Sequence, residues 1–200
     1  MLNRDKRNIF SGFHGRFNDD IVFKQRQGKT ILCCYPKGQK VKWTENQKEH
    51  RVKFKLATMY AGSVMKNPEK LLFYQEREHD DINAYNLAIA DYLKRPVISS
   101  IQVRKSRERG QYLVQVRATD EFIITGVEIQ LFDLSGKFME RVHATQFRHT
   151  ARWIYKIERG KLGTVALIKA IADDYAGHCA VMDYLISPED AIKWLPHSKM

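Results

Sequence analysis

The chain has 200 residues, 44% of them hydrophobic and 28% charged, and a formal net charge of +11. This apolar content is ordinary for a globular protein and argues against a disordered chain. No apolar run approaches the roughly 18–20 residues that span a bilayer. Residues 1–7 carry positive charge without an apolar segment behind them, so we expect no secretory signal and a cytoplasmic location.

The positive charge is unevenly distributed along the chain. Residues 1–66 contain 15 Lys and Arg against 5 Asp and Glu, whereas residues 67–96 contain 4 against 6. Residues 97–200 contain 15 against 12 and are only weakly basic. Because a concentrated basic segment is typical of a surface that meets a polyanion or an acidic protein, we expect the first third to bind such a partner.

Three cysteines are present, at positions 33, 34 and 179. Adjacent cysteines rarely bridge each other and an odd count leaves a free thiol, which fits a reducing compartment. Cys33 or Cys34 beside cations could have a lowered pKa, but a nucleophile also needs an oriented base. We expect these cysteines to be buried small apolar side chains.

Residues 8–35 have the pattern of a β-hairpin or short meander. The strand candidates are residues 21–26 and 30–35, with a glycine-containing turn between them. Gly12 and Gly15 lie among aromatic residues ahead of these strands, which indicates a tight turn.

Helical signals follow from residue 44 onward. Thr44 and Gln47 form a capping box, and apolar residues then recur at helical spacing: Val52, Leu56, Met59, Tyr60 and Val64. Asn67-Pro68 starts a second helix. We expect Asp80 or Asp81 to cap a third helix, whose core face would contain four apolar residues: Tyr85, Leu87, Ala88 and Tyr92.

Beyond Pro96 the apolar spacing changes from helical to alternating. Turn signals separate seven strand candidates: 98–105, 111–119, 124–133, 137–146, 151–158, 164–172 and 179–186. Seven short strands at this spacing are typical of an immunoglobulin-like or fibronectin-like β-sandwich.

The predicted fold class is therefore α+β. An N-terminal β-hairpin and about three α-helices precede an all-β immunoglobulin- or fibronectin-like sandwich and a short C-terminal helix. The predicted domains are residues 1–96, 97–187 and 188–200, and the last begins at the helix-start pattern Pro188-Glu189-Asp190.

The basic first third supplies the candidate site residues. Its cations alternate with aromatic residues, a pattern in which cations can neutralise phosphates and exposed rings can stack on bases. The alternative is that the rings pack a small core and the cations form its solvated face. The candidates for binding nucleic acid or an acidic partner are Arg16, Lys24, Arg26, Lys29, Lys37, Lys40, Lys42, Lys48, Arg51 and Lys55.

Other chemistries have little support in the sequence. His143 and His149 fit no metal-ligand spacing, and the carboxylate pairs at residues 19–20 and 173–174 lie where turns are expected. The sequence contains no P-loop and no dinucleotide-binding fingerprint. We therefore expect no catalytic residue, no metal and no cofactor, and a protein that is not an enzyme.

Turn glycines, a helix cap and packing aromatics form a pattern over most of the chain, up to about residue 186. The N-terminal part of the pattern consists of Ser11-Gly12, Gly15, Val22-Phe23, Gly28-Lys29-Thr30, Pro36, Thr44-Glu45, Gln47, Arg51, Phe54, Ala57 and Tyr60-Ala61. The rest consists of Ala84-Tyr85-Asn86-Leu87-Ala88, Asp91-Tyr92, Pro96, Ala118, Asp120, Phe122, Val127-Glu128-Ile129, Gly136, Trp153-Ile154-Tyr155, Ala172-Asp173 and Gly177.

This pattern resembles uncharacterised protein families of Bacteroidetes-type bacteria, in which a helical part leads into an immunoglobulin-like domain. The resemblance implies an architecture and no activity. The chain departs from the commoner pattern at residues 19–20 and in its heavier load of Lys and Arg.

Composition and pattern together predict a non-enzymatic binding or assembly protein. The first expectation is that the basic N-terminal module contacts a polyanion, in particular DNA or RNA. The alternative is a structural subunit or adaptor of a multi-protein, phage-like assembly, in which the sandwich makes protein contacts and the basic arm meets an acidic neighbour. A homo-oligomer or larger assembly is compatible with either, and no membrane partner is expected.

Overall fold

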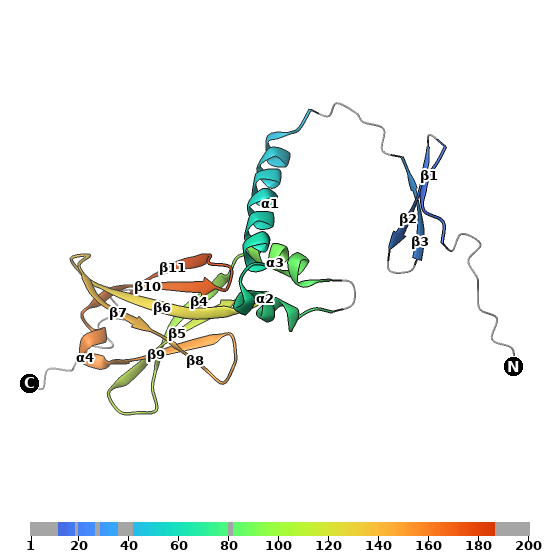
Figure 1. The fold of residues 1–200 in the computed structure, drawn as a ribbon. Helices are drawn as coiled ribbons and strands as arrows, with labels where there is room; N and C mark the ends of the chain where they lie inside the picture. The colour runs from blue at the N-terminus through green and yellow to red at the C-terminus, as the bar shows by residue number, and fades with distance from the viewer. Residues whose placement is uncertain (1–11, 19, 27–28, 36–41, 80–81, 187–200) are drawn as a thin grey trace, which may run out of the picture. The chain divides into compact units, whose positions relative to one another are not determined.

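The structure is a computed structural model that describes residues 12–18, 20–26, 29–35, 42–79 and 82–186 (Figure 1). The chain divides into two compact units. The first unit comprises residues 1–51 and 79–81, and the second comprises residues 52–78 and 82–200. The predicted domain boundaries at residues 96 and 187 divide the chain differently and stay a prediction.

A small antiparallel sheet forms most of what is described of the first unit. β1 (Gly15–Phe17) pairs with β2 (Ile21–Arg26), which pairs with β3 (Lys29–Cys34). The predicted hairpin is present, with β1 as an additional edge strand. Gly15, the first residue of β1, has a φ of 106°, a backbone conformation that favours glycine.

Three helices follow, and side-chain caps define where they begin. α1 spans Glu45–Val64, α2 spans Pro68–Gln75 and α3 spans Ala84–Leu93. Asn67 Oδ1 accepts hydrogen bonds from the backbone N–H groups of Glu69 and Lys70, each at 3.1 Å, so the predicted start of α2 is confirmed. The cap of α3 is Asn83, whose Oδ1 accepts from the N–H of Asn86 at 3.0 Å. The predicted caps, Asp80 and Asp81, lie outside the described residues.

α1 buries small residues rather than its large apolar ones. Ala57, Ala61 and Val64, the last residue of the helix, are all fully buried. Val52 and Met59, which the helical spacing singled out, are 59% and 63% exposed. The core side of α1 therefore includes Val64 and, in part, Tyr60 from the predicted stripe, whereas the N-terminal residues of that stripe are exposed.

The described part of the second unit contains eight strands in two four-stranded antiparallel sheets. One sheet has the order β11-β10-β6-β7 and the other has the order β4-β5-β9-β8. The strands are β4 (Val97–Lys105), β5 (Gln111–Thr119), β6 (Ile124–Asp133), β7 (Phe138–His143), β8 (Thr145–Gln146), β9 (Arg152–Glu158), β10 (Val165–Asp174) and β11 (Cys179–Leu185). The seven predicted strands are found within a few residues of their predicted ends, and the fourth is divided into β7 and β8.

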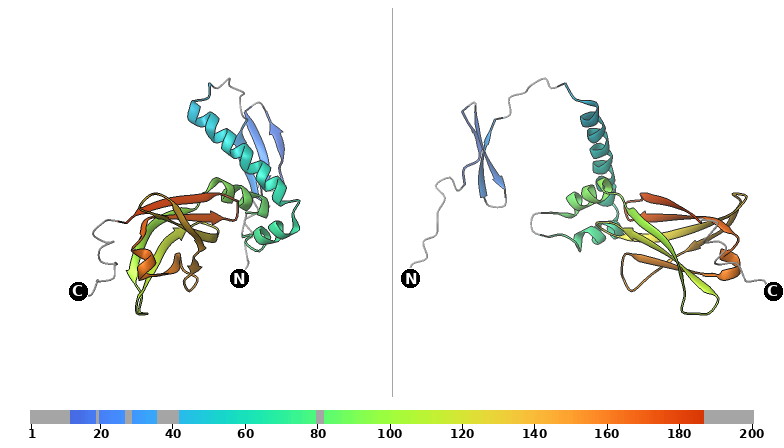
Figure 2. Two further views of the ribbon diagram at one scale, coloured as in Figure 1. Left: turned by 90° about the vertical axis from the view of Figure 1, so that its left-hand side faces the viewer. Right: turned by 180° about the vertical axis from the view of Figure 1, so that it is seen from behind.

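Alternating residues of the two sheets face each other and form one hydrophobic core. Val114 and Val116 of β5 are fully buried, as are Ile129 and Leu131 of β6. This burial of every second residue is what a half-buried strand requires, and it makes the two sheets a β-sandwich. Figure 2 shows the two sheets packed together from two further sides.

A second hydrophobic cluster attaches the helices to one end of the sandwich. Tyr74 of α2 and Leu87 of α3 are buried in it, and Phe122 and Tyr175 from the sandwich pack against it. The rings of Phe73 and Tyr175 stack with centroids 3.9 Å apart. Within the second unit the helices therefore pack against residues of the sandwich, and Figure 1 shows α2 and α3 beside one end of the sheets.

The predicted α+β class is wrong for this chain. Strands make up 47% and helices 26% of the described residues, so the protein is mostly β, with three antiparallel sheets. The main helices lie in the middle of the chain, between the small sheet and the sandwich, and do not form an N-terminal helical part. A single turn of helix, α4 (Arg159–Leu162), also separates β9 from β10. The predicted helix from residue 188 lies outside the described residues.

Candidate functional site

Four of the predicted site residues lie on one face of the small sheet. In the register of β2 and β3, Arg26 lies directly opposite Lys29. Lys24 lies two residues before Arg26 and therefore on the same face, since side chains alternate along a strand. Arg16 pairs with Val22, which also belongs to this face. We call Arg16, Lys24, Arg26 and Lys29 the cationic sheet face.

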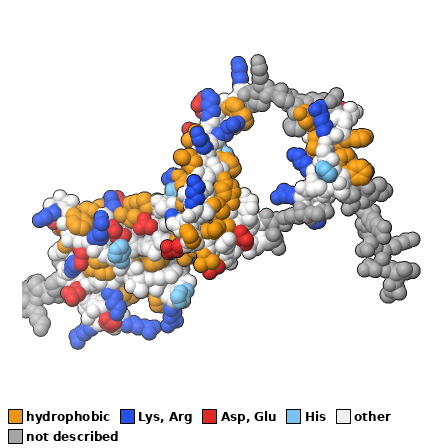
Figure 3. Space-filling view, in the orientation of Figure 1, with side chains coloured by type: hydrophobic (Ala, Val, Ile, Leu, Met, Phe, Trp, Pro, Cys, Tyr) orange, Lys and Arg blue, Asp and Glu red, His pale blue; other side chains and the backbone are white. Residues whose placement is uncertain are grey.

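The opposite face of the sheet carries phenylalanine rings. The ring of Phe23 lies 5.7 Å from the ring of Phe13 and 6.3 Å from that of Phe17. Leu32, opposite Phe23 in the register, extends this surface. In Figure 3 the Lys and Arg side chains of this sheet lie on one side and its hydrophobic side chains on the other. The phenylalanine rings thus lie opposite the cations, whereas the ring of Tyr35 lies against Arg16 of the cationic sheet face.

Three of the four cations on the sheet face have no acidic neighbour in the described part of the chain. Lys24, Arg26 and Lys29 are exposed and make no ion pair there. The guanidinium group of Arg16 lies over the ring of Tyr35, 4.1 Å from its centroid, in a cation–π arrangement. This surface therefore presents positive charge that the described residues leave largely uncompensated.

A second group of predicted site residues lies on one face of α1. Lys48, Arg51 and Lys55 follow at intervals of three and four residues, which places them side by side on a helix. Arg51 lies over the ring of Trp43 at 4.3 Å, and Lys48 Nζ is 2.7 Å from Glu45 Oε1. Both side chains of this ion pair are more than half exposed, so the pair leaves the lysine available to solvent.

The remaining predicted residues belong to neither group. Lys42 is exposed and lies shortly before α1. Lys37 and Lys40 lie outside the described residues. The structure thus brings together four predicted cations on the sheet and three on the helix, and each group remains a predicted binding surface.

A polar network that the sequence did not indicate is buried beneath the helices. The hydroxyl of Tyr74 donates a hydrogen bond to Asp91 Oδ2. The hydroxyls of Tyr74 and Tyr60 are hydrogen-bonded at 3.0 Å, and Tyr60 also donates to the carbonyl oxygen of Tyr175 at 3.4 Å. Asp91 has no solvent exposure, and its Oδ1 has no hydrogen-bond partner among the described residues.

Burial raises the pKa of Asp91 to about 6. The hydrogen bond from Tyr74 opposes this shift, while the nearby carboxylates of Asp120 and Asp174 reinforce it. Burial is also the main reason why the pKa values of Tyr60 and Tyr74 are raised. The network is closed by apolar packing, and we therefore assign it to stability rather than to binding.

Cations outside the predicted set gather at the turn between β4 and β5. Lys105, Arg107 and Arg109 come from the turn and its flank, and Arg159 comes from the start of α4. The sequence did contain a signal, since residues 104–109 include four Lys or Arg. The signal was hidden because the C-terminal half as a whole is only weakly basic.

The described residues add no candidate for a metal site or a reactive cysteine. The described residues contain no group of three or more His, Cys, Asp or Glu side chains arranged to hold a metal ion. Cys33 is half-buried, whereas Cys34 and Cys179 are exposed, so the expectation of buried cysteines is wrong for these two. None of the helices in the described ranges has the length and apolar character needed to cross a bilayer.

The chain was compared with known protein families and with curated proteins. No protein-family model matches the chain, and no curated protein matches it either. The functional argument therefore rests on the geometry described above.

Proposed function

We propose that this protein is a non-enzymatic binding protein whose cationic sheet face contacts the phosphate backbone of nucleic acid. The observation that supports this proposal most is the placement of Arg16, Lys24, Arg26 and Lys29 on one face of a three-stranded sheet. Cations on a rigid, exposed surface neutralise phosphates and release counterions, which favours binding of any polyanion.

The pairing of Arg26 with Lys29 supports a role in binding. Like charges directly opposite each other in an antiparallel pair destabilise the sheet. A phosphate placed between the two side chains would relieve this repulsion. The bound state would therefore be favoured by the local electrostatics of the sheet itself.

The separation of the two sheet faces favours contacts to the backbone over stacking on bases. Single-strand binding surfaces place aromatic rings beside their cations, so that bases stack while phosphates are neutralised. Here Phe13, Phe17 and Phe23 lie on the face opposite the cations, and the ring of Tyr35, beside the cations, is covered by Arg16. We therefore propose binding with little sequence preference, since phosphate contacts position a protein without reading bases.

Helix α1 is proposed to contribute in the same way. Arg51 is held over Trp43, and Lys48 and Lys55 lie on the same face of the helix. An arginine restrained by an aromatic ring loses less side-chain freedom when it binds a phosphate. Cytoplasmic residence, expected from the sequence, is part of this proposal.

The test is the salt dependence of binding to a short DNA duplex, measured by fluorescence anisotropy. The triple variant Lys24→Gln, Arg26→Gln, Lys29→Gln should bind about tenfold or more weakly at low salt. The slope of log K against log salt should become shallower by about 0.9 for each phosphate that the variant no longer neutralises. A matched control removes the same charge from exposed positions in the second unit: Lys66→Gln, Arg117→Gln, Lys137→Gln.

Two results would contradict the proposal. One is an affinity that does not change between low and moderate salt, because phosphate contacts always release counterions. The other is an equal loss of affinity in the triple variant and in the control, which would show that only net charge matters.

The second candidate function is that of an adaptor in a protein assembly. β11 is an edge strand of the sandwich, and its residues Val181 and Leu185 are 55% and 76% exposed. An open edge with apolar side chains can accept an added strand from a partner. Size-exclusion chromatography with light scattering tests this candidate: a stable oligomer or complex supports it, and a monomer without any co-purifying protein rules it out.

A further inference from the structure

One face of the sheet β11-β10-β6-β7 points away from the core of the sandwich. Side chains alternate along each strand, so the neighbours of the buried residues Ile168 and Leu131 lie on this outward face. Strand register aligns the outward residues into rows that cross all four strands. The row at the end of the sheet where β11 ends, which we call the apolar row, consists of Leu185, Leu167, Phe132 and Phe138.

The apolar row is open to solvent at both edges of the sheet. Leu185 is 76% exposed and Phe138 is 50% exposed, and Leu167 and Phe132 between them are half-buried. The rings of Phe132 and Phe138 meet edge to face, with centroids 5.8 Å apart. The same face carries two further apolar residues, paired with each other in the register: Ile171 and Val181. An exposed apolar surface that four strands share is typical of an interaction site.

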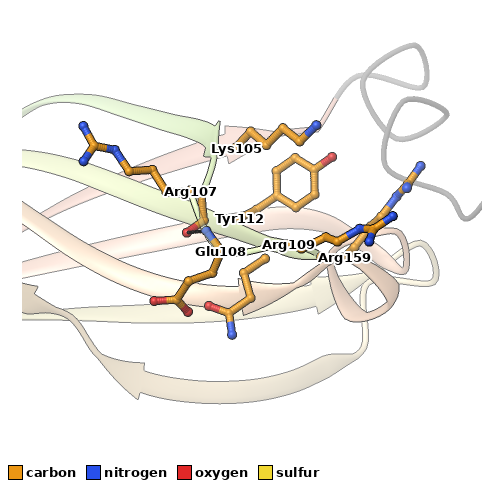
Figure 4. A pocket seen from close by; sticks show the side chains of 9 residues that line it. Lys105, Arg107, Glu108, Arg109, Tyr112 and Arg159 are labelled. Carbon is orange, nitrogen blue, oxygen red and sulfur yellow. Dashed lines mark hydrogen bonds between the residues drawn. The ribbon is translucent and has the colours of Figure 1, made fainter.

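The charged side chains beside the apolar row are paired with each other. Lys169 Nζ lies 3.8 Å from Asp183 Oδ1, directly across the ladder. Arg141 Nε lies 3.1 Å from Glu128 Oε1. The cations that gather in the second unit lie at the β4–β5 turn of the other sheet (Figure 4). This part of the outward face therefore has no excess charge with which to attract a nucleic acid or an acidic protein.

We propose that the apolar row packs against the same row of a second copy of this chain. The outward face of a sheet fits another sheet of the same twist, because the side chains of two such faces interdigitate. A second copy supplies that face, and a twofold axis makes one surface complementary to itself. Since the charges beside the row are paired, two copies meet here without the repulsion that a net charge of +11 causes elsewhere.

The size of the surface sets the strength of this contact. A face of four short strands is small for a permanent interface, so we expect a reversible dimer that forms at micromolar concentrations. The surface lies in the second unit and contains no residue of the cationic sheet face. It therefore stands or falls independently of the proposed function.

The experiment measures the dimerisation of the full chain by sedimentation velocity between about 5 and about 500 μM. Leu167→Gln should raise the dissociation constant about tenfold or more, because the twofold axis removes two apolar contacts at once. The matched control is Leu113→Gln, which should change the constant less than about twofold. Leu113 is also half-buried and faces outward from a central strand, but its strand, β5, belongs to the other sheet.

A second measurement locates the contact in the unsubstituted chain. Backbone amide shifts recorded by NMR should change on dilution at the apolar row and at its neighbours in β10 and β6. This readout does not depend on the folding of any variant. Three results would overturn the proposal: a monomer over the whole concentration range, equal effects of the two substitutions, or dilution shifts confined to the free edge of β11. The last result would indicate strand addition at that edge instead.

Discussion

Asp91 is a carboxyl group in the interior of the second unit, enclosed by helices α1, α2 and α3 and by the end of the sandwich. Its pKa of about 6 in the folded chain lies above the ordinary value of 3.8. Between these two values the folded state binds more protons than the unfolded state does. The free energy of unfolding should therefore rise as the pH falls from about 7 to about 4, and the contribution is about 3 kcal/mol.

The variant Asp91→Asn tests this contribution. The amide oxygen can still accept the hydrogen bond from Tyr74, while the buried charge is removed. At pH 7 the variant should be at least as stable as the wild type. As the pH falls, the wild type should gain stability relative to the variant, because only the wild type has the titrating carboxyl group. Urea unfolding at a series of pH values measures the effect. A difference in the free energy of unfolding that stays constant with pH would contradict this prediction. The control is Asp173→Asn, at an exposed position.

At the scale of the element, helix α1 displays two surfaces that the sequence does not distinguish. Ala57, Ala61 and Val64 face the core, while Val52, Leu56 and Met59 face solvent. Because helical spacing alone cannot tell which apolar stripe is covered, the large residues are the natural choice from the sequence. The structure selects the small ones, since they allow the helix to approach its neighbours closely.

Two substitutions separate these surfaces. Ala61→Leu should lower the free energy of unfolding by about 1–3 kcal/mol, because extra methylene groups overpack a filled core. Leu56→Ala, on the exposed stripe, should change stability by no more than about 0.5 kcal/mol. Chemical denaturation of both variants decides the question, and the reverse order of effects would mean that the stripe of large residues is the buried one.

At the scale of the whole molecule, the second unit should unfold as one cooperative body. Phe122 and Tyr175 extend from the sandwich into the cluster beneath the helices. Leu131 is fully buried in β6, and Leu131→Ala should cost about 2–5 kcal/mol. Because Phe122 and Tyr175 of the sandwich pack against the helices, the destabilisation should appear equally in the helices and in the strands.

Hydrogen exchange provides the measurement for this prediction. In Leu131→Ala the slowest amides of α3 and of β10 should lose protection by the same amount. The control is Leu134→Ala in the turn after β6, where the side chain is 86% exposed and its removal should have no effect. Reduced protection confined to the strands would show that the helices form a separate cooperative unit.

The sequence determined the local elements well. Period-two alternation and turn residues placed the strands between Val97 and Leu185 within a few residues, and the capping box at Thr44 placed the start of α1. These signals are local, because side-chain alternation and caps depend on neighbours a few residues away. The predicted α+β class is wrong because the helices, although their signals are clear, contain far fewer residues than the strands do.

Only the tertiary structure decided which residues act together. Strand register places four cations on one face, namely Arg16, Lys24, Arg26 and Lys29, and the rings of Phe17 and Phe23 on the other. Packing of three helices on the sandwich buries Asp91 beside Tyr74, although 17 positions separate them in the chain. Folding likewise brings Arg159 of α4 close to the cations of the β4–β5 turn. Residues distant in sequence become neighbours only through pairing and packing, and a periodicity read along the chain cannot contain that information.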